Sequence, residues 1–284
     1  MDAIKVEGLT KRYSNFTLDG ISFTIPQGVI VGFVGENGAG KTTAIKAMLG
    51  LIQKDAGEAL LLGHSAREAD GAWKEEIGVV FDESYFPENL TPGDVEKIMK
   101  RMYRTWDSQK YRGYLQRFHV PEKIRFKELS RGMKMKLSIA VALSHASRLL
   151  ILDEATSGLD PVIRNEMLDI FLEFIQDESN TVLISSHITS DVEKIADYIL
   201  MIHKGKILLY ENKDTLLYQY GLVRCCVKEF QELRDEHCIS YRKNAFGYEM
   251  LVDNREDWEK AGDWVVDRIS LEDLFLFLVK EEIR

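Results

Sequence analysis

The sequence G-E-N-G-A-G-K-T-T, from Gly35 to Thr43, lies between a short apolar run and a segment with helical periodicity. Its spacing is G-x-x-x-x-G-K-[ST], in which inward-turned backbone amides and a helix N-terminus surround phosphate oxygens. The pattern predicts a nucleoside triphosphate site rather than a glycine-rich turn that binds nothing. The predicted contacts come from Gly35, Asn37, Gly38, Gly40, Lys41, Thr42 and Thr43, with Lys41 on the β- and γ-phosphates.

Two acidic residues end a second apolar run, R-L-L-I-L-D-E, from Arg148 to Glu154. Such a run is typical of a strand buried in a parallel sheet, and ligands bind beyond the carboxyl ends of those strands. We therefore expect Asp153 to share a Mg²⁺ ion with Thr42. We expect Glu154, one residue further on, to polarise the attacking water and act in catalysis.

A histidine follows a third apolar run, T-V-L-I-S, which begins at Thr181. His187 thus also falls at the carboxyl end of a strand, where it can bond the γ-phosphate or steer the water. The alternative is a surface histidine at a helix entry. The segment that follows reads as an amphipathic helix with Asp191, Glu193 and Lys194 facing outward.

The base of the nucleotide is predicted from the absence of a guanine-reading motif in the sequence. A guanine-reading motif would be N-K-x-D, and the N-K-D at Asn212 to Asp214 has its aspartate one place early. Adenine is therefore favoured. Tyr13 lies upstream of the phosphate loop, where its ring can stack on a base, although packing is the simpler role for a lone tyrosine.

A second serine and glycine turn, L-S-R-G-M-K, begins at Leu129 and opens another apparent helix. By itself it reads equally as a serine-capped helix. The order of all these parts, with S-G-L-D from Ser157 to Asp160, resembles that of the ATP-binding cassette (ABC) ATPases. The resemblance is to the nucleotide-binding subunit of a transporter and covers roughly Met1 to Tyr220.

This resemblance implies an α/β fold, a P-loop cassette with a mixed sheet and a helical subdomain. It implies ATP and Mg²⁺, and a second cassette, identical or different, that faces the first head to tail. In that arrangement Ser130 and Gly132 complete the site on the partner, while Asp160 is a further nucleotide-binding residue, Tyr13 stacks on adenine and His187 acts in catalysis. It also implies a separate transmembrane permease as the driven partner.

Several residues depart from the family pattern. Arg131 and Met133 replace the glycine and glutamine of the familiar L-S-G-G-Q, and Ala155 replaces the proline after Glu154. Asp82 stands where the family has glutamine, and its carboxylate is expected to reach Mg²⁺ directly or through water. These changes bear on the rate of turnover more than on nucleotide binding.

The organisation along the chain predicts two domains: a cassette, 1–220, with a helical subdomain at about 84–146, and a small accessory α+β domain, 221–284. Thr91 and Pro92 mark a helix start, and Val95, Ile98, Met99 and Met102 share one face of that helix. Tyr85, Phe86 and Trp106 are permease-contact candidates, with core packing as the alternative. The final helix, capped by Ser270 and Asp273, resembles the tail of ATPases from drug- or lipid-exporting systems, which favours export.

Composition bounds the remaining choices. The formal charge is −9, so nucleic acid is not an expected partner, and the three cysteines lack metal-site spacing. No apolar run approaches the ~20 residues of a membrane span, so we expect a cytoplasmic protein. The resemblance to transporter subunits implies that it lies peripherally on the inner face of the cell membrane. Two alternatives stay open: a soluble ABC ATPase of DNA repair or translation, and a nucleotide-gated regulator with weak hydrolysis.

Overall fold

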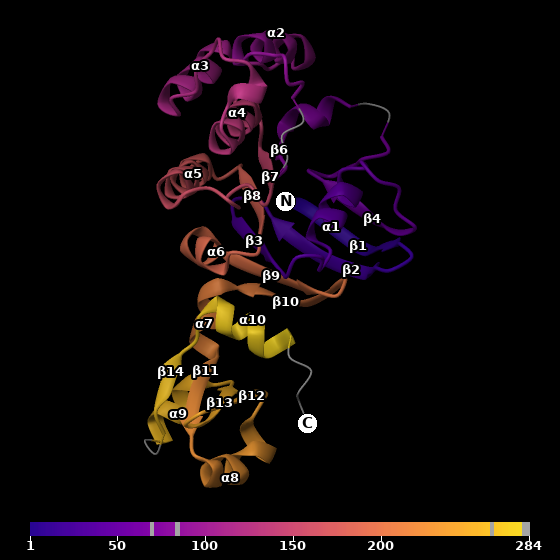
Figure 1. Cartoon of the computed structure of the whole chain (residues 1–284). Helices are drawn as coiled ribbons and strands as arrows, with labels where there is room; N and C mark the ends of the chain where they lie inside the picture. The colour runs from indigo at the N-terminus through magenta and orange to yellow at the C-terminus, as the bar shows by residue number, and fades with distance from the viewer. Residues whose placement is uncertain (69–70, 83–85, 262–263, 280–284) are drawn as a thin grey trace.

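The computed structural model describes the chain except residues 69–70, 83–85, 262–263 and 280–284 and the side chains of 234–237 (Figure 1). A six-stranded sheet runs through the cassette in the order β10-β9-β3-β8-β7-β6, parallel apart from the edge strand β10. Its strands are β3 (Ile30–Val34), β6 (Ile77–Val80), β7 (Leu149–Asp153), β8 (Thr181–Ser186), β9 (Tyr198–His203) and β10 (Lys206–Asn212).

The central strands are buried on both faces, which is why their sequences are continuously apolar rather than alternating. Alternate residues of β3 enter different cores: Ile30 and Val34 face one side of the sheet, Val31 and Phe33 the other. The second side is covered by an antiparallel sheet and α1 (Lys41–Met48). That sheet consists of β1 (Asp2–Arg12), β2 (Thr17–Pro26), β4 (Ala56–Leu61) and β5 (His64–Ser65).

Helices cover the first side of the sheet, and those that lie between β6 and β7 in the chain form the lobe seen at the top of Figure 1. The helices on this side are α2 (Pro92–Met102), α3 (Ser108–Arg117), α4 (Arg131–Leu143), α5 (Pro161–Phe174), α6 (Thr189–Ile195) and α7 (Lys213–Gln219), with the 3₁₀ turn η2 (Phe126–Glu128). Another 3₁₀ turn, η1 (Ala72–Glu76), places Trp73 in the core on the second side. The predicted helix start is confirmed, because Thr91 and Asp94 form a capping box at α2. In the described part of the chain, no helix combines the length and apolar character needed to cross a bilayer.

The apolar face predicted for α2 is only partly covered. Val95 is buried, whereas Ile98 is 39% and Met102 64% exposed. Trp106 packs against Tyr111 of α3, with ring centroids 5.1 Å apart, which favours the core alternative for this candidate. Tyr85, another contact candidate, lies outside the described residues.

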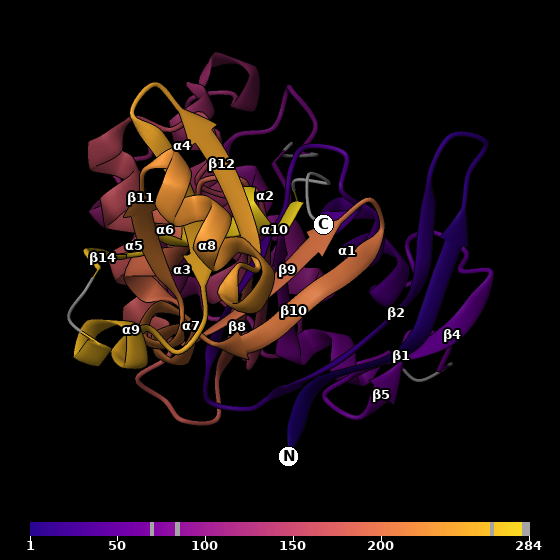
Figure 2. The same ribbon diagram turned by 90° about the horizontal axis from the view of Figure 1, so that it is seen from below.

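The segment from residue 221 onward is a βαββαβ unit followed by one more helix (Figure 2). Its sheet order, β12-β13-β11-β14, with all neighbours antiparallel, is that of the ferredoxin-like arrangement. The elements are β11 (Gly221–Cys225), α8 (Val227–His237), β12 (Ser240–Asn244), β13 (Gly247–Val252), α9 (Arg255–Ala261), β14 (Val266–Arg268) and α10 (Leu271–Val279).

The two faces of this second sheet pack differently. Val223 and Met250 face a small core with α8 and α9, whereas Leu222 and Leu251 join the cassette core together with α10. Ser270 caps α10, because its Oγ accepts a 3.1 Å hydrogen bond from the backbone N–H of Asp273, as the sequence predicted. Because the unit shares a core with the cassette, the boundary at residue 221 stays a prediction.

Candidate functional site

The phosphate loop joins the carboxyl end of β3 to the N-terminus of α1. Gly40 has φ +115°, and a Cβ at this position would lie 2.8 Å from the Phe16 ring, so only glycine fits. The side chain of Lys41 is 5% exposed, and its Nζ donates to the carbonyl oxygens of Gly35 at 2.6 Å and Glu36 at 3.3 Å. A buried ammonium held at the mouth of a loop is suited to an anionic ligand.

The two predicted acids lie directly after one another at the end of β7. Asp153 is 3% exposed, and its Oδ1 accepts a 2.6 Å hydrogen bond from Ser185 Oγ on the adjacent strand β8. Glu154 has φ +53°, a conformation that costs free energy for a residue with a side chain. Its backbone N–H donates to both oxygens of Ser185 at 3.1 Å, which holds the strained residue in place.

Glu154 and His187 lie side by side because β7 and β8 are neighbours in the sheet. His187 Nδ1 is 2.6 Å from Glu154 Oε2. The other carboxylate oxygen, Oε1, lies 3.2 Å from Lys41 Nζ, an ion-pair distance without hydrogen-bond geometry. The structure therefore brings Lys41, Asp153, Glu154 and His187 together, as the strand-end argument predicted.

The second turn lies at the N-terminus of α4. Ser130 caps this helix by accepting from Met133 N at 3.2 Å, and Asp160 caps α5 in the same way through Val162 and Ile163. A Cβ on Gly132 would lie 3.1 Å from Ile163 Cδ1, so the two helix starts pack closely. Within the described residues, these contacts are all local and none reaches the phosphate loop.

The aromatic ring that is predicted to stack on adenine is accessible at the surface. Tyr13 is 47% exposed, and Lys11 Nζ lies 5.4 Å from its ring centroid. Its backbone N–H donates to Phe16 O at 2.8 Å, and Phe16 in turn packs against Gly40. This turn fixes Tyr13 near the phosphate loop, although its stacking role stays a prediction.

Asp82 follows β6 and makes an ion pair that the sequence did not indicate. Its Oδ1 lies 2.6 Å from an amino group of Arg131, so two of the departures from the family pattern contact each other. Its metal-ligand role stays a prediction. Asp191, by contrast, was expected to face outward and is 1% exposed, 3.6 Å from Arg164 Nε, so that expectation was wrong.

Comparisons with known proteins decide the family. Residues 18–157 match the family described as ABC transporter. A lantibiotic transport ATP-binding protein of Streptococcus pyogenes is 36% identical over 214 residues, which cover 74% of this chain and 91% of that protein. A bacitracin transport ATP-binding protein of Enterococcus faecalis is 34% identical, with 75% of this chain and 70% of that protein covered.

The chain belongs to the ABC transporter family, as an ATP-binding subunit. Solved structures agree in fold: the ATP-binding subunit of an ABC transporter superposes with a TM-score of 0.68 at 24% identity, covering 75% of this cassette chain and 91% of that one. A dimeric cassette bound to ADP and phosphate gives a TM-score of 0.66 at 20% identity, covering 74% and 98%.

Family membership confirms the predicted fold class, nucleotide binding and ATPase activity of the cassette. The soluble non-transport alternative is not favoured, because the matching relatives are named for transport. The individual site residues, however, are placed by geometry alone, and their roles are argued below as proposals.

Sequence reasoning missed several residues of the cassette site. Ser185 ends the predicted strand T-V-L-I-S, but its hydrogen bonds to Asp153 and Glu154 were not predicted. The available signal was a small polar residue at the end of an apolar strand. Helix α10 was not expected near the nucleotide either. Its Glu272, Phe275 and Leu276 line a cavity of about 480 Å³ whose other walls come from residues 34–37 and 187–190.

Proposed function

We propose that two copies of this chain close head to tail around Mg-ATP and hydrolyse it to drive a separate membrane permease. The observation that carries this proposal is the division of the site. Lys41, Asp153, Glu154 and His187 converge on one surface, while Ser130 caps its own helix and makes no contact with that group among the described residues. A second copy supplies the missing turn.

The phosphate loop binds the triphosphate through its inward backbone amides and the α1 N-terminus. Lys41 then exchanges its present partners, the Gly35 carbonyl and the Glu154 carboxylate, for β- and γ-phosphate oxygens. The exchange replaces one buried anionic partner by another, so the ammonium is never left unpaired. Tyr13 stacks on adenine at the rim of the same site.

Glu154 orients the attacking water and accepts its proton as the oxygen approaches the γ-phosphorus. The bond between the γ-phosphorus and the bridging oxygen breaks, and ADP and phosphate result. His187 holds the carboxylate through the 2.6 Å contact and can bond the γ-phosphate. Ser185 fixes the backbone of Glu154 and the side chain of Asp153 in register for this step.

The residues present also fit Mg²⁺. This ion accepts one or two protein oxygens and completes its shell with phosphates and water, and Thr42 and Asp153 provide such oxygens at the loop and the strand end. Bound Mg²⁺ would neutralise charge on the β- and γ-phosphates.

In the closed pair, Ser130 and the amides near Gly132 meet the γ-phosphate bound to the partner chain, and Asp160 contacts the same site. A helix N-terminus favours an anion through its partial positive charge and its unpaired N–H groups. ATP is then part of the interface, so it stabilises the closed pair by mass action. Hydrolysis removes the bridging phosphate and releases the two chains.

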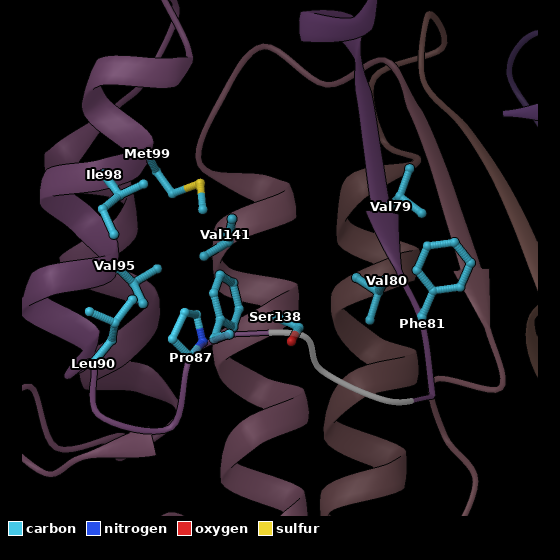
Figure 3. Close-up of a pocket in the computed structure, with 11 residues that line it drawn as sticks. Val79, Val80, Phe81, Pro87, Leu90, Val95, Ile98, Met99, Ser138 and Val141 are labelled. Atoms are coloured by element: carbon cyan, nitrogen blue, oxygen red, sulfur yellow. The ribbon is translucent and has the colours of Figure 1, made fainter. Parts of the chain in front are cut away.

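The permease contact is proposed at an apolar groove of about 390 Å³ in the helical lobe. Figure 3 shows Leu90 and the α2 residues Val95, Ile98 and Met99 on one side, α4 on another, and the end of β6 with Phe81 opposite them. Such a groove accepts an apolar helix of a partner. The occupant we propose is a short helix on the cytoplasmic side of the permease.

This docking is tested by reconstituting the chain with its permease, which is to be sought among the multi-span membrane proteins encoded by neighbouring genes. Ile98→Asp puts a charge into the groove and is expected to abolish stimulation of the ATPase by that protein, while the basal rate stays within twofold. Met102→Asp, one turn further along α2 and not lining the groove, is the matched control. Equal stimulation of both variants would exclude the groove as the docking site.

The direction of transport is proposed as export, and the chain as peripheral on the cytoplasmic face of the membrane. Support comes from relatives named for transport of a lantibiotic and of bacitracin. Vesicles that contain the permease, with the cassette on the outer face, are expected to accumulate substrate inside when ATP is added outside. Loss of preloaded substrate would indicate import instead.

The pairing itself is tested with Glu154→Gln, which retains nucleotide binding but removes the proton acceptor. Sedimentation is expected to show a dimer with saturating Mg-ATP and a monomer without it, whereas the surface control Glu58→Gln hydrolyses ATP normally. A Glu154→Gln chain that stays monomeric would contradict the self-paired clamp. Equal, near-zero hydrolysis by wild type and Glu154→Gln would instead support the nucleotide-gated regulator.

A further inference from the structure

Arg131 is an unusual residue for the position that it occupies. It is the first residue of α4, where the helix dipole disfavours a cation. Asp82 offsets this cost, because its carboxylate lies 2.6 Å from the guanidinium. The acid and the base are 49 residues apart in sequence, and each replaces an uncharged residue of the family pattern.

The same guanidinium covers the turn that follows Glu154. Gly158 has φ +67°, and a Cβ there would lie 2.6 Å from one guanidinium nitrogen of Arg131 and 2.8 Å from Cζ. Position 158 therefore requires glycine for two reasons. Its backbone is in the left-handed region, and the guanidinium group of Arg131 leaves no room for a Cβ atom. One side chain therefore contacts both the segment after β6 and the turn after β7.

These contacts join two regions whose roles are proposed above. Phe81, the residue before Asp82, lines the apolar groove, and Ser130, the residue before Arg131, is the group that must reach the partner's triphosphate. A chain of direct contacts thus runs from the groove through Asp82 and Arg131 to the second turn. Gly158 anchors this chain to the part of the cassette that holds Glu154.

We propose that Arg131 is a positioning residue. Within one chain, it ties the second turn, at Ser130, to the segment after β6 that borders the groove and to the turn that follows Glu154. By holding the start of α4 in place, it sets how much ATP is needed to close the pair. This inference rests on the proposed head-to-tail clamp. Asp82 thereby acts first as the partner of Arg131, beside any role it has toward Mg²⁺.

The size of the effect follows from the exposure of the pair. The side chains of Arg131 and Asp82 are 55% and 45% exposed, so solvent screens much of their attraction. An exposed pair contributes at most about fivefold to an equilibrium constant. The tie is therefore strong enough to tune closure and too weak to prevent it.

The test is a charge swap in the Glu154→Gln background, read as the ATP concentration at half-maximal dimer formation. Arg131→Glu and Asp82→Arg alone are each expected to raise that concentration by up to about fivefold, and the double swap is expected to return it to the parent value. Arg117→Glu breaks a similar pair with Glu173, also at 2.6 Å and with exposures of 42% and 56%, and is expected to change nothing.

Each outcome decides between the two proposals. If the Glu154→Gln parent does not dimerise with ATP, the clamp fails, and this inference fails with it. If the parent dimerises but the single variants leave the ATP dependence unchanged or lower it, the clamp stands and the positioning role is wrong. Unfolding midpoints within 2 °C of the parent separate a local tie from a general loss of structure, and unrescued variants would also overturn the proposal.

Discussion

Replacing Ser185 by alanine tests the arrangement of the two acids most specifically. Ser185 is fully buried, and its hydroxyl donates to Asp153 at 2.6 Å while both of its oxygens accept from Glu154 N. The hydrogen bond to Asp153 is charge-assisted, and that carboxylate is only 3% exposed, so water cannot readily replace the hydroxyl.

The expected cost follows from this burial. A hydrogen bond to a buried charge contributes about 1.5–3 kcal/mol, so Ser185→Ala should lower the free energy of unfolding by that amount in urea titrations. Because Asp153 and Glu154 lose a shared restraint, kcat for ATP hydrolysis should fall on the order of tenfold. KM for ATP should change less than about threefold, since the phosphate loop keeps its own contacts.

The matched control is Ser144→Ala. Ser144 is also fully buried, but its hydroxyl donates to the neutral carbonyl of Ala140 at the end of α4. Its loss should cost only about 0.5–1.5 kcal/mol of stability and leave kcat unchanged. If Ser185→Ala retains wild-type kcat, or if both variants lose equal turnover, the positioning of the acids by Ser185 is refuted.

Three further predictions concern stacking on adenine, a buried histidine and the last helix. Tyr13→Ala should raise KM for ATP about tenfold through loss of stacking, whereas Tyr13→Phe should leave it unchanged in steady-state kinetics. Burial lowers the pKa of His145, whose Nδ1 lies 2.7 Å from the Glu75 carbonyl oxygen. As the pH falls, this imidazole therefore becomes protonated in the unfolded chain at a higher pH than in the folded chain. The free energy of unfolding should thus fall below about pH 6.5, by at most about 1.4 kcal/mol per pH unit, and His145→Gln should lack this contribution in urea titrations at pH 7.5 and 5.5. Leu274→Ala, at a fully buried position, should destabilise the chain by about 2–5 kcal/mol, far more than Leu276→Ala, which alters a side chain 38% exposed.

The phosphate loop and the strand ends could be predicted because their signals are local. A glycine spacing, a lysine and a helix start lie within nine residues, from Gly35 to Thr43, and the buried strands are continuously apolar. The grouping of Asp153, Glu154 and His187 followed from one rule, that parallel strands present their carboxyl ends at the same edge.

Other contacts could not be predicted because they depend on tertiary packing. The pairing of Asp82 with Arg131 joins residues 49 apart, and no periodicity carries that information. The βαββαβ order of the appendage required knowing which strands pair, which short alternating runs leave open. Asp191 lies on a helix face that looked polar, but Arg164 of α5 approaches it and the side chain is buried.

The central claim, that each nucleotide lies between two chains, is tested most directly by mixing two defective variants. Lys41→Ala lacks the phosphate-binding ammonium, and Ser130→Asp retains a helix cap but places a negative charge against the partner's γ-phosphate. Each variant alone should be inactive. An equimolar mixture should regain about a quarter of wild-type ATPase activity, because half of the pairs are mixed and each mixed pair has one intact site. A mixture no more active than its separate components would contradict the account.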